Sequence, residues 1–381
     1  MPPRLYQFPW MDADIEAFRE QVGRYIRAEL APRLPEWRRQ GYIPRTVWQG
    51  MGALGFLLPE LPAEYGGAGT SAAYQLVLQD ELAKAEMPGT LTVHAIVAHY
   101  ILDYGTPAQK AHWLPRLASG EHLGGIALTE PGHGSDLKAL RTTARRDGDD
   151  HAVNGSKIFI TNGSTASMLA VACRTGGDGA RGISLILMET ENQPGFKVGS
   201  RLEKLGQHAS DTAELYFDNV RVPASNILGG AEGQGFAQLM SQLPFERLLI
   251  AVPAAAQIEC ALNHTIAYTK QRRMFGGSLF DMQNTRFKLA EIATTAHIVR
   301  GFVNDCIQRL VDGTLDDEAA YMAKWWCTEQ QCRVTDECLQ LFGGYGYMVE
   351  YPIARLFADA RVQKIYGGAN EVMKDLIARS L

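Results

Sequence analysis

A glutamate and an arginine that are adjacent in the sequence are the residues of this chain best suited to acid–base chemistry. Glu246 and Arg247 lie within Leu243-Pro244-Phe245-Glu246-Arg247-Leu248-Leu249-Ile250, so apolar residues flank the carboxylate on several sides. A glutamate on a helix usually faces solvent, but apolar neighbours favour partial desolvation and a perturbed pKa. Such a carboxylate can serve as a general base. Arg247 can serve simply as its ion-pair partner.

Three glycine-rich turns offer backbone N–H groups to a ligand. Residues 132–136 (GHGSD) can wrap the polar edge of a cofactor, or can form an ordinary surface turn. Residues 340–347 (QLFGGYGY) predict the C-cap of a long helix. Residues 366–371 (YGGANE) precede the last helix, whose N-terminus could bind an anion or a polarised carbonyl. None of these turns is a Walker loop or a GxGxxG dinucleotide motif.

Length and composition indicate a folded protein of more than one domain. The 381 residues correspond to two or three domains, and 46% hydrophobic with 21% charged residues is typical of a globular chain. A net charge of −5 argues against a partner that is a nucleic acid or an anionic membrane. The sequence has no run of eighteen apolar residues, which excludes a predicted membrane span, and its first residues resemble neither a signal nor a transit peptide.

The six cysteines predict reduced thiols rather than disulfides. They form no CxxC pair and no zinc spacing with histidine, and most of them lie in segments with helical periodicity. The nine histidines likewise fall in no metal-binding pattern. We therefore expect a cytoplasmic protein without a bound metal.

The spacing of apolar residues divides the chain into three zones. Up to about residue 120 the spacing is helical, and Ile15, Phe18, Val22 and Ile26 define the buried stripe of a first helix. Residues 124–228 contain segments of strand length, and Asn154-Gly155 predicts a hairpin turn between two of them. From residue 235 onward long helical patterns return, at 246–271, 284–311 and 316–342.

The predicted fold class is therefore α+β and multidomain. Residues 1–122 are expected to form an N-terminal helical domain, residues 123–232 a middle β-barrel-like domain, and residues 233–381 a C-terminal four-helix bundle. Two stripes are expected to face the core of this bundle. The first comprises Phe287, Ala290, Ile298, Phe302, Ile307 and Leu310, and the second Ala319, Ala323, Trp326, Cys327, Val334, Cys338 and Leu341.

Five segments, taken in order, resemble the acyl-CoA dehydrogenases. They are EPGHGSD at 130–136, KIFITNG at 157–163, SDT at 210–212, QLFGGYGY at 340–347, and DAR with IYGG within 359–368. The resemblance extends over nearly the whole chain, and the helical, β, helical order matches that family's architecture. It implies FAD as cofactor, an acyl-CoA as substrate and an electron-transfer flavoprotein as electron acceptor. It also implies a homotetramer arranged as a dimer of dimers.

The resemblance assigns binding residues by position. Those expected at the FAD of the same subunit are Ile126, Leu128, Thr129, Gly134, Ser135, Phe159, Ile160, Thr161, Ala369 and Glu371. Those expected at the FAD of a neighbouring subunit are Arg272, Phe275, Gln283, Gln340, Gly343 and Gly344. The substrate is expected to contact Ser135, Arg247, Gly367 and Gly368. Phe159 replaces a Trp found in many relatives, and Ala369 replaces a hydroxyl residue, so one hydrogen bond to the flavin is expected to be missing.

The catalytic base distinguishes two groups within this family. Many members carry the base immediately after the Ile-Tyr of the last glycine turn, where this chain has Gly367. A minority, including long-chain and isovaleryl-CoA dehydrogenases, supply it from a helix, and Glu246 matches that alternative in a segment most similar to the long-chain type. Pro253, two helical turns further along, predicts a kink and a reshaped acyl pocket.

The resemblance implies α,β-dehydrogenation of an acyl-CoA to the trans-2-enoyl-CoA, in fatty-acid or branched-acyl catabolism. Glu246 would remove the α-proton while hydride leaves the β-carbon for the flavin. The Gly367 N–H and a ribityl hydroxyl would stabilise the charge that develops on the thioester oxygen. Two alternatives use the same scaffold. One is an oxidase, or a dehydrogenase of acyl groups tethered to a carrier protein, and the other is a non-catalytic flavoprotein or nucleic-acid binder.

Overall fold

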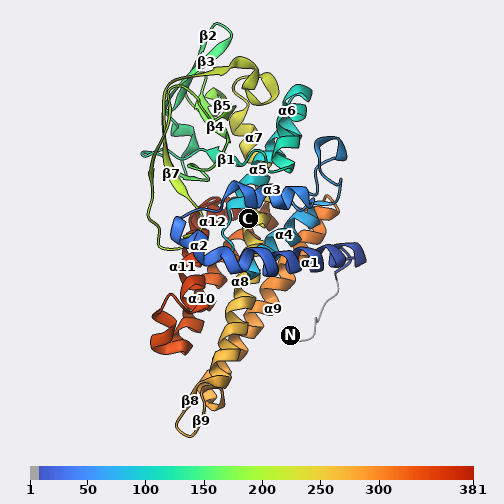
Figure 1. Cartoon of the computed structure of the whole chain (residues 1–381), viewed down its shortest axis with the longest axis vertical. Coiled ribbons are helices and arrows are strands. Elements are labelled where there is room, and N and C mark those ends of the chain that lie inside the picture. The colour runs from blue at the N-terminus through green and yellow to red at the C-terminus, as the bar shows by residue number, and fades with distance from the viewer. Residues whose placement is uncertain (1–7) are drawn as a thin grey trace.

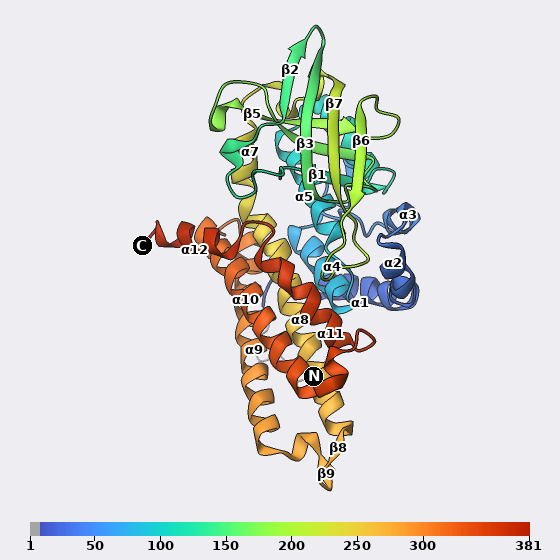
Figure 2. The ribbon, with the colours of Figure 1, turned by 90° about the vertical axis from the view of Figure 1, so that its left-hand side faces the viewer.

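A computed structural model describes residues 8–381 of the chain. Residues 1–7 lie outside the described part. They begin the predicted N-terminal domain, and they also begin the segment that we expect not to be a leader peptide. The molecule is elongated, with a β-sheet at one end and long helices at the other (Figures 1 and 2). The helices of the N-terminal part lie between these two ends, beside the sheet and the bundle.

The N-terminal part is helical, as predicted. Its helices are α1 (Ala13–Tyr25), α2 (Leu34–Gln40), α3 (Arg45–Ala53), α4 (Ala72–Lys84), α5 (Thr90–Tyr104) and α6 (Pro107–Ala118). The Asp12 carboxylate caps α1 by accepting the Ile15 N–H at 2.8 Å, and Thr106 with Gln109 forms a capping box on α6. Ile15, Val22 and Ile26 are buried, so the stripe predicted for the first helix faces the core.

The middle part is a curled sheet of seven strands. They are β1 (Gly124–Ala127), β2 (Thr143–Asp147), β3 (Asp150–Thr161), β4 (Met168–Arg174), β5 (Ile183–Glu189), β6 (Phe196–Arg201) and β7 (Thr212–Pro223). Their order is β1-β4-β2-β3-β7-β6, with β5 paired to β4, and β1 runs parallel to β4. The inner face is filled by β-branched and other apolar side chains, which is the barrel-like domain that the sequence predicts.

The hairpin turn predicted at Asn154-Gly155 is wrong, because these residues lie inside β3. The chain reverses instead between β2 and β3 at Gly148, whose φ is +64°. Asn154 and Gly155 mark an irregularity in the pairing of β3 with β7. A Cβ at residue 155 would lie 2.6 Å from the Thr142 hydroxyl oxygen, so this glycine permits close approach of backbone rather than a turn.

The C-terminal part is the predicted helical bundle. It contains α7 (Gly235–Ser241), α8 (Leu243–Gln271), α9 (Gln283–Val311), α10 (Asp317–Phe342), α11 (Pro352–Ala360) and α12 (Asn370–Ala378). The hairpin of β8 (Arg273–Met274) and β9 (Gly277–Ser278) joins α8 to α9 at the far tip of the molecule (Figure 2). Helix α8 packs against α4, α9 and α10 and so forms the central element. The element order confirms the predicted fold class, whereas the domain boundaries stay predictions.

The first predicted stripe of the bundle is wrong in part. Phe287, Ala290 and Ile298 on α9 are exposed, and the core side of that helix carries Leu289, Ile292 and Val299 instead. The second stripe is buried on α10, except that Trp326 is exposed and Leu341 is half-buried. The apolar residues of α9 occupy more than one face, so spacing alone did not identify which face meets the core.

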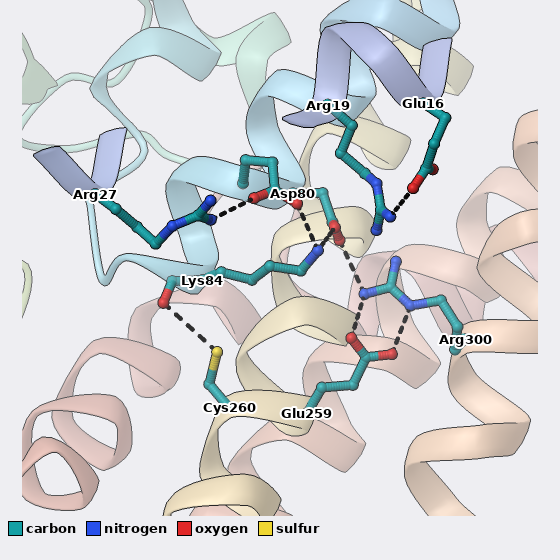
Figure 3. A network of polar contacts seen from close by, with 9 residues as sticks. Glu16, Arg19, Arg27, Asp80, Lys84, Glu259, Cys260 and Arg300 are labelled. Atoms are coloured by element: carbon teal, nitrogen blue, oxygen red, sulfur yellow. Dashed lines mark hydrogen bonds and ion pairs between the residues drawn. The ribbon is translucent and has the colours of Figure 1, made fainter. Parts of the chain in front are cut away.

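Charged side chains connect three helices beneath α1 (Figure 3). Arg300 on α9 lies 2.8 Å from a carboxylate oxygen of Asp80 on α4 and 2.7 Å from one of Glu259 on α8. The Lys84 ammonium lies 2.6 Å from the other oxygen of Asp80. Although burial opposes ionisation, Arg300 and Lys84 hold the pKa of Asp80 below its usual value. The network therefore fixes α4, α8 and α9 against one another.

Within residues 8–381, no helix combines the length and apolar content that crossing a membrane requires. In the same residues, no group of three or more histidine, cysteine or acidic side chains is placed to hold a metal ion. All six cysteines are free thiols, as predicted, and five of them lie in the bundle helices. The cytoplasmic location stays a prediction.

We expect Arg300→Met to destabilise the fold by about 2 kcal/mol, because it removes the counter-ion that Asp80 and Glu259 share and leaves the buried Asp80 with Lys84 alone. The free energy of unfolding from urea titration measures this loss. The matched control is Arg333→Met, which removes a largely exposed ion pair with Glu337 four residues away and should cost under about 0.5 kcal/mol. Equal losses in the two variants would contradict a structural role for the Arg300 network.

Candidate active site

Glu246 lies in the first turn of α8, near the positive end of the helix dipole. Its neighbours Phe245, Arg247, Leu248 and Leu249 are buried, and its own side chain is only 13% exposed. The predicted desolvation of this carboxylate is therefore present in the structure.

Two polar side chains hold the Glu246 carboxylate. The Tyr100 hydroxyl of α5 donates to Oε1 at 2.5 Å, and the Arg247 guanidinium lies 3.6 Å from Oε2. Burial raises the pKa of Glu246, while Arg247 and the Tyr100 hydrogen bond offset part of that rise. The site thus contains a fixed carboxylate whose affinity for a proton is above that of an ordinary glutamate, which is what a general base requires.

The glycine turn before α12 packs against the same turn of α8. Gly367 and Gly368 have φ values of +60° and +85°. A Cβ on Gly367 would lie 2.2 Å from the Ile250 Cδ1 atom, and one on Gly368 would lie 3.3 Å from the Arg247 Nη2 atom. A side chain at residue 367 would therefore combine backbone strain with a steric clash. A side chain at the position where many relatives carry their base would therefore require the Ile250 side chain to move.

Sequence reasoning missed the residues that hold this glycine turn. Lys324 of α10 is fully buried, and its ammonium donates to the Gly368 carbonyl at 2.6 Å and to Asn370 Oδ1 at 2.9 Å. The Thr328 hydroxyl also donates to Asn370, at 3.2 Å. A signal was available, because Lys324 falls between Ala323 and Cys327 of the stripe predicted to be buried. Tyr100 was missed too, and its sequence context offered no comparable signal.

The edge of the sheet brings together two of the segments expected to bind FAD. The Ile158 N–H donates to the Thr129 carbonyl at 2.9 Å, which places the end of β1 beside β3. Phe159 has a φ of +59° and is 63% exposed, at a break in the pairing of β3 with β7. Positive φ at an aromatic residue is strained and is found most often at functional sites. Ile160 points into the core of the sheet, so only its backbone can reach a ligand.

A buried ion pair anchors the adjoining glycine turn. Lys157 donates to Glu130 at 2.9 Å and to the Leu128 carbonyl at 3.0 Å. Although burial opposes it, Lys157 together with hydrogen bonds from Thr142 lowers the pKa of Glu130 to about 2. Gly134 and Ser135, which follow in the same turn, remain exposed. The turn therefore presents its N–H and hydroxyl groups from a fixed base.

Polar contacts connect the sheet to the helices that carry Glu246. The Asn162 amide donates to the Thr90 carbonyl at 3.1 Å, at the start of the helix that supplies Tyr100. Gln207, on the loop before β7, donates to the Tyr366 hydroxyl at 3.4 Å.

The exposed Phe159 ring and the Thr129, Ser135 and Thr161 hydroxyls suit a flat ring with a polar edge, so the residues present fit FAD.

Three family models cover most of the chain. They are the acyl-CoA dehydrogenase N-terminal domain at residues 12–121, the middle domain at 125–220 and the C-terminal domain at 233–381. The chain belongs to the acyl-CoA dehydrogenases. This family is FAD-dependent, so the protein is an oxidoreductase with FAD as its cofactor.

Similar proteins match over almost their full length. Long-chain specific acyl-CoA dehydrogenase of Sus scrofa mitochondria is 43% identical over 371 residues, covering 96% of this chain and 86% of that protein. An acyl-CoA dehydrogenase of Bacillus subtilis is 39% identical, covering 95% and 96%. The crystal structure of an acyl-CoA dehydrogenase from Geobacillus kaustophilus is 44% identical, with a TM-score of 0.96 and coverage of 98% and 99%.

In this acyl-CoA dehydrogenase, the residues predicted to contact the FAD of a neighbouring subunit lie far from Glu246. Arg272 follows it by 26 residues on or just beyond α8, which is about 40 Å along a helix. The Arg272 guanidinium lies 5.6 Å from the centre of the Tyr345 ring, beside the end of α10. Gln283, Gln340, Gly343 and Gly344 are exposed at this end of the bundle, and Phe275 is 91% exposed. One chain alone does not bring this set to the Glu246 site.

Ala369 and Glu371 lie on either side of the start of α12. Ala369 is half-buried and is the N-cap residue, with no side-chain hydrogen bond to the helix. Glu371 is exposed in the first turn. Both adjoin the turn held by Lys324, so they are placed to contact a cofactor bound there, and that role stays a prediction.

We expect Tyr100→Phe to move the acidic limb of the pH profile for kcat/KM to higher pH. Only ionised Glu246 can accept a proton, so activity should rise with pH through its raised pKa. Removing the Tyr100 hydrogen bond removes a contribution that lowers this pKa. Tyr104→Phe, on the same helix, is the control because Tyr104 bonds Ser241 instead. An unchanged limb in Tyr100→Phe would show that Glu246 does not set the profile.

Proposed function

We propose that this protein dehydrogenates an acyl-CoA thioester between its α and β carbons, with Glu246 as the base and the trans-2-enoyl-CoA as the product. The observation that supports this most strongly is the position of Glu246. It is a buried carboxylate beside a glycine turn that carries no acidic side chain at residue 367.

Each step assigned to the chain follows from the groups around Glu246. The carboxylate takes the α-proton, and the low exposure of the site strengthens its affinity for that proton. The Gly367 N–H donates to the thioester oxygen, where negative charge develops as the proton leaves. Lys324 fixes the carbonyl of the next residue and so holds the orientation of this donor. FAD, when bound, supplies the acceptor for the hydride from the β-carbon.

We further propose how the subunits assemble around the cofactor. In its own subunit, FAD would be bound by Ile126, Leu128, Thr129, Gly134, Ser135, Phe159, Ile160, Thr161, Ala369 and Glu371. In a homotetramer arranged as a dimer of dimers, the FAD of a neighbouring subunit would be contacted by Arg272, Phe275, Gln283, Gln340, Gly343 and Gly344. Their distance from Glu246 in a single chain and the exposure of Phe275 support this arrangement. The Arg272 guanidinium suits a pyrophosphate.

The proposed setting is fatty-acid or branched-acyl catabolism, in the cytoplasm. The substrate would contact Ser135, Arg247, Gly367 and Gly368. An electron-transfer flavoprotein would reoxidise the flavin. Arg247 supports this role because its guanidinium is buried against both glycines of the turn.

The test is anaerobic reduction of the bound flavin by acyl-CoA, followed by its absorbance. We expect Glu246→Gln to retain flavin but to lose about 10²–10⁴-fold in the rate of bleaching, which is the usual contribution of a positioned base. Glu36→Gln, an exposed change on α2, should react like the unaltered protein. A fully active Glu246→Gln variant would exclude this glutamate as the base. Stoichiometric peroxide in air would instead identify an oxidase.

A further inference from the structure

Two buried cations lie next to Gly368, in the glycine turn that adjoins the proposed base. The Lys324 ammonium of α10 donates to the Gly368 carbonyl at 2.6 Å. On α8, the Arg247 Nη2 atom lies 3.3 Å from where a Cβ on Gly368 would stand. Lys324 is fully buried, and Arg247 is 5% exposed. Lysine and arginine are almost never buried to this extent without a counter-ion, so two negative charges are expected nearby.

One of these cations has a buried acid beside it and the other does not. The Glu246 Oε2 atom lies 3.6 Å from the Arg247 guanidinium. The acceptors that Lys324 binds within residues 8–381 are neutral, namely the Gly368 carbonyl and, at 2.9 Å, Asn370 Oδ1. Glu371 acts on Lys324 only through space, and it is exposed. With Lys324 protonated, two buried positive charges therefore face one buried negative charge.

The proposed reaction produces a negative charge at this place. When the α-proton passes to Glu246, the charge of that carboxylate is transferred to the thioester oxygen, to which the Gly367 N–H donates. Gly367 directly precedes the residue whose carbonyl Lys324 holds. A positive charge that is already in place stabilises the developing anion without any rearrangement of the protein. The unbalanced ammonium is thus matched by the anion that the reaction forms.

The surroundings of Lys324 fix its position on α10. The Thr328 hydroxyl donates to the same Asn370 oxygen at 3.2 Å. The Asn370 amide donates to Glu329 Oε2 at 3.3 Å, and the Lys364 ammonium donates to Glu329 Oε1 at 2.8 Å. Lys364 precedes the glycine turn and Asn370 follows it, so both ends of the turn are joined through one carboxylate. The ammonium and the turn are therefore held together before a substrate binds.

We propose that Lys324 is a positioning residue whose positive charge, and not only its hydrogen bonds, promotes the reaction by stabilising the anion that develops on the thioester oxygen. It acts through the turn of Gly367 and Gly368 and does not itself contact the substrate. The inference rests on the proposed function, because it requires the α-proton to pass to Glu246 while the thioester oxygen lies at this turn.

The charge of Lys324 sets an upper limit of pH for the reaction. Burial, and after it Arg247, lowers the pKa of Lys324 to about 7, and Glu371 opposes this shift. Glu329, the other acid of the network, is paired with Lys364. The ammonium loses its proton as the pH rises through its pKa, so kcat/KM of the unaltered protein should fall above about pH 7. In Lys324→Gln there is no charge to lose, and this alkaline limb should be absent.

The decisive experiment uses a series of 3-thiaacyl-CoAs. Sulfur in place of the β-carbon makes the α-proton more acidic and leaves no β-hydride to transfer, so the reaction stops after proton transfer. The enolate is measured by its long-wavelength absorbance with the bound flavin. At about pH 6, where Lys324 is charged, Lys324→Gln and Lys324→Met should lower the ratio of enolate to neutral bound analogue by at least about 10-fold, as expected for the loss of a nearby charge in a desolvated site.

Lys374→Met is the matched control. Lys374 is an exposed lysine of α12 whose ammonium lies 5.2 Å from the centre of the Trp325 ring on α10. This variant removes an equal charge near the same two helices, but from a position that solvent screens. It should keep both the enolate ratio and the alkaline limb. Flavin content and circular dichroism establish that each variant is folded.

Each outcome separates the inference from the proposed function. An unchanged enolate ratio in folded Lys324→Gln, or an alkaline limb that persists in it, overturns the inference while the proposed dehydrogenation stands. If neither Lys324 variant folds, the unaltered protein decides: a fall of kcat/KM above about pH 7 supports the inference, and a constant value overturns it. If the unaltered protein forms no enolate and no acyl-CoA bleaches its flavin, both the inference and the proposed function fail.

Discussion

The close packing of a glycine turn onto the first turn of α8 is the constraint on which the proposed chemistry depends. Gly367 and Gly368 approach the helix so closely that a Cβ on Gly367 would overlap Ile250. Because neither glycine has a side chain, these two residues contribute only backbone groups at this place. The helix itself supplies the acid, Glu246, and the two kinds of group meet at one place. The proposed base, Glu246, and the proposed donor to the thioester oxygen, Gly367, therefore come from segments 121 positions apart in the sequence.

The turn keeps this position because buried polar groups hold it from behind. Lys324 and Thr328 both bind Asn370 at the start of α12, and Lys324 also binds the Gly368 carbonyl. Burial, with a further contribution from Arg247, lowers the pKa of Lys324 to about 7. An ammonium that is costly to bury is retained where it satisfies a backbone carbonyl that would otherwise lack a partner. Its position supports orientation of the turn rather than stability alone.

Burial and hydrogen bonding act together on the proposed base. Glu246 is desolvated yet partnered by Tyr100 and Arg247, so its proton affinity rises while its position stays fixed. This arrangement is what removal of a proton from an α-carbon requires.

The sequence alone determined the order of helices and strands, the ends of the long helices and the buried setting of Glu246. These follow from periodicity and from apolar neighbours, which are local properties of the chain. The hairpin turn predicted at Asn154-Gly155 was wrong, because a bulge and a turn share the same residue types. The prediction that Phe287 and Ile298 face the core was wrong, because α9 has apolar residues on several faces.

Only the tertiary structure decided which distant groups meet. Tyr100 and Lys324 belong to different helices, α5 and α10, and their contacts depend on how those helices pack. No spacing within one segment encodes a contact between segments, because the contact exists only once both are placed against α8. The proposed base was therefore accessible from the sequence, through its resemblance to the family, whereas the groups that hold and tune it were not.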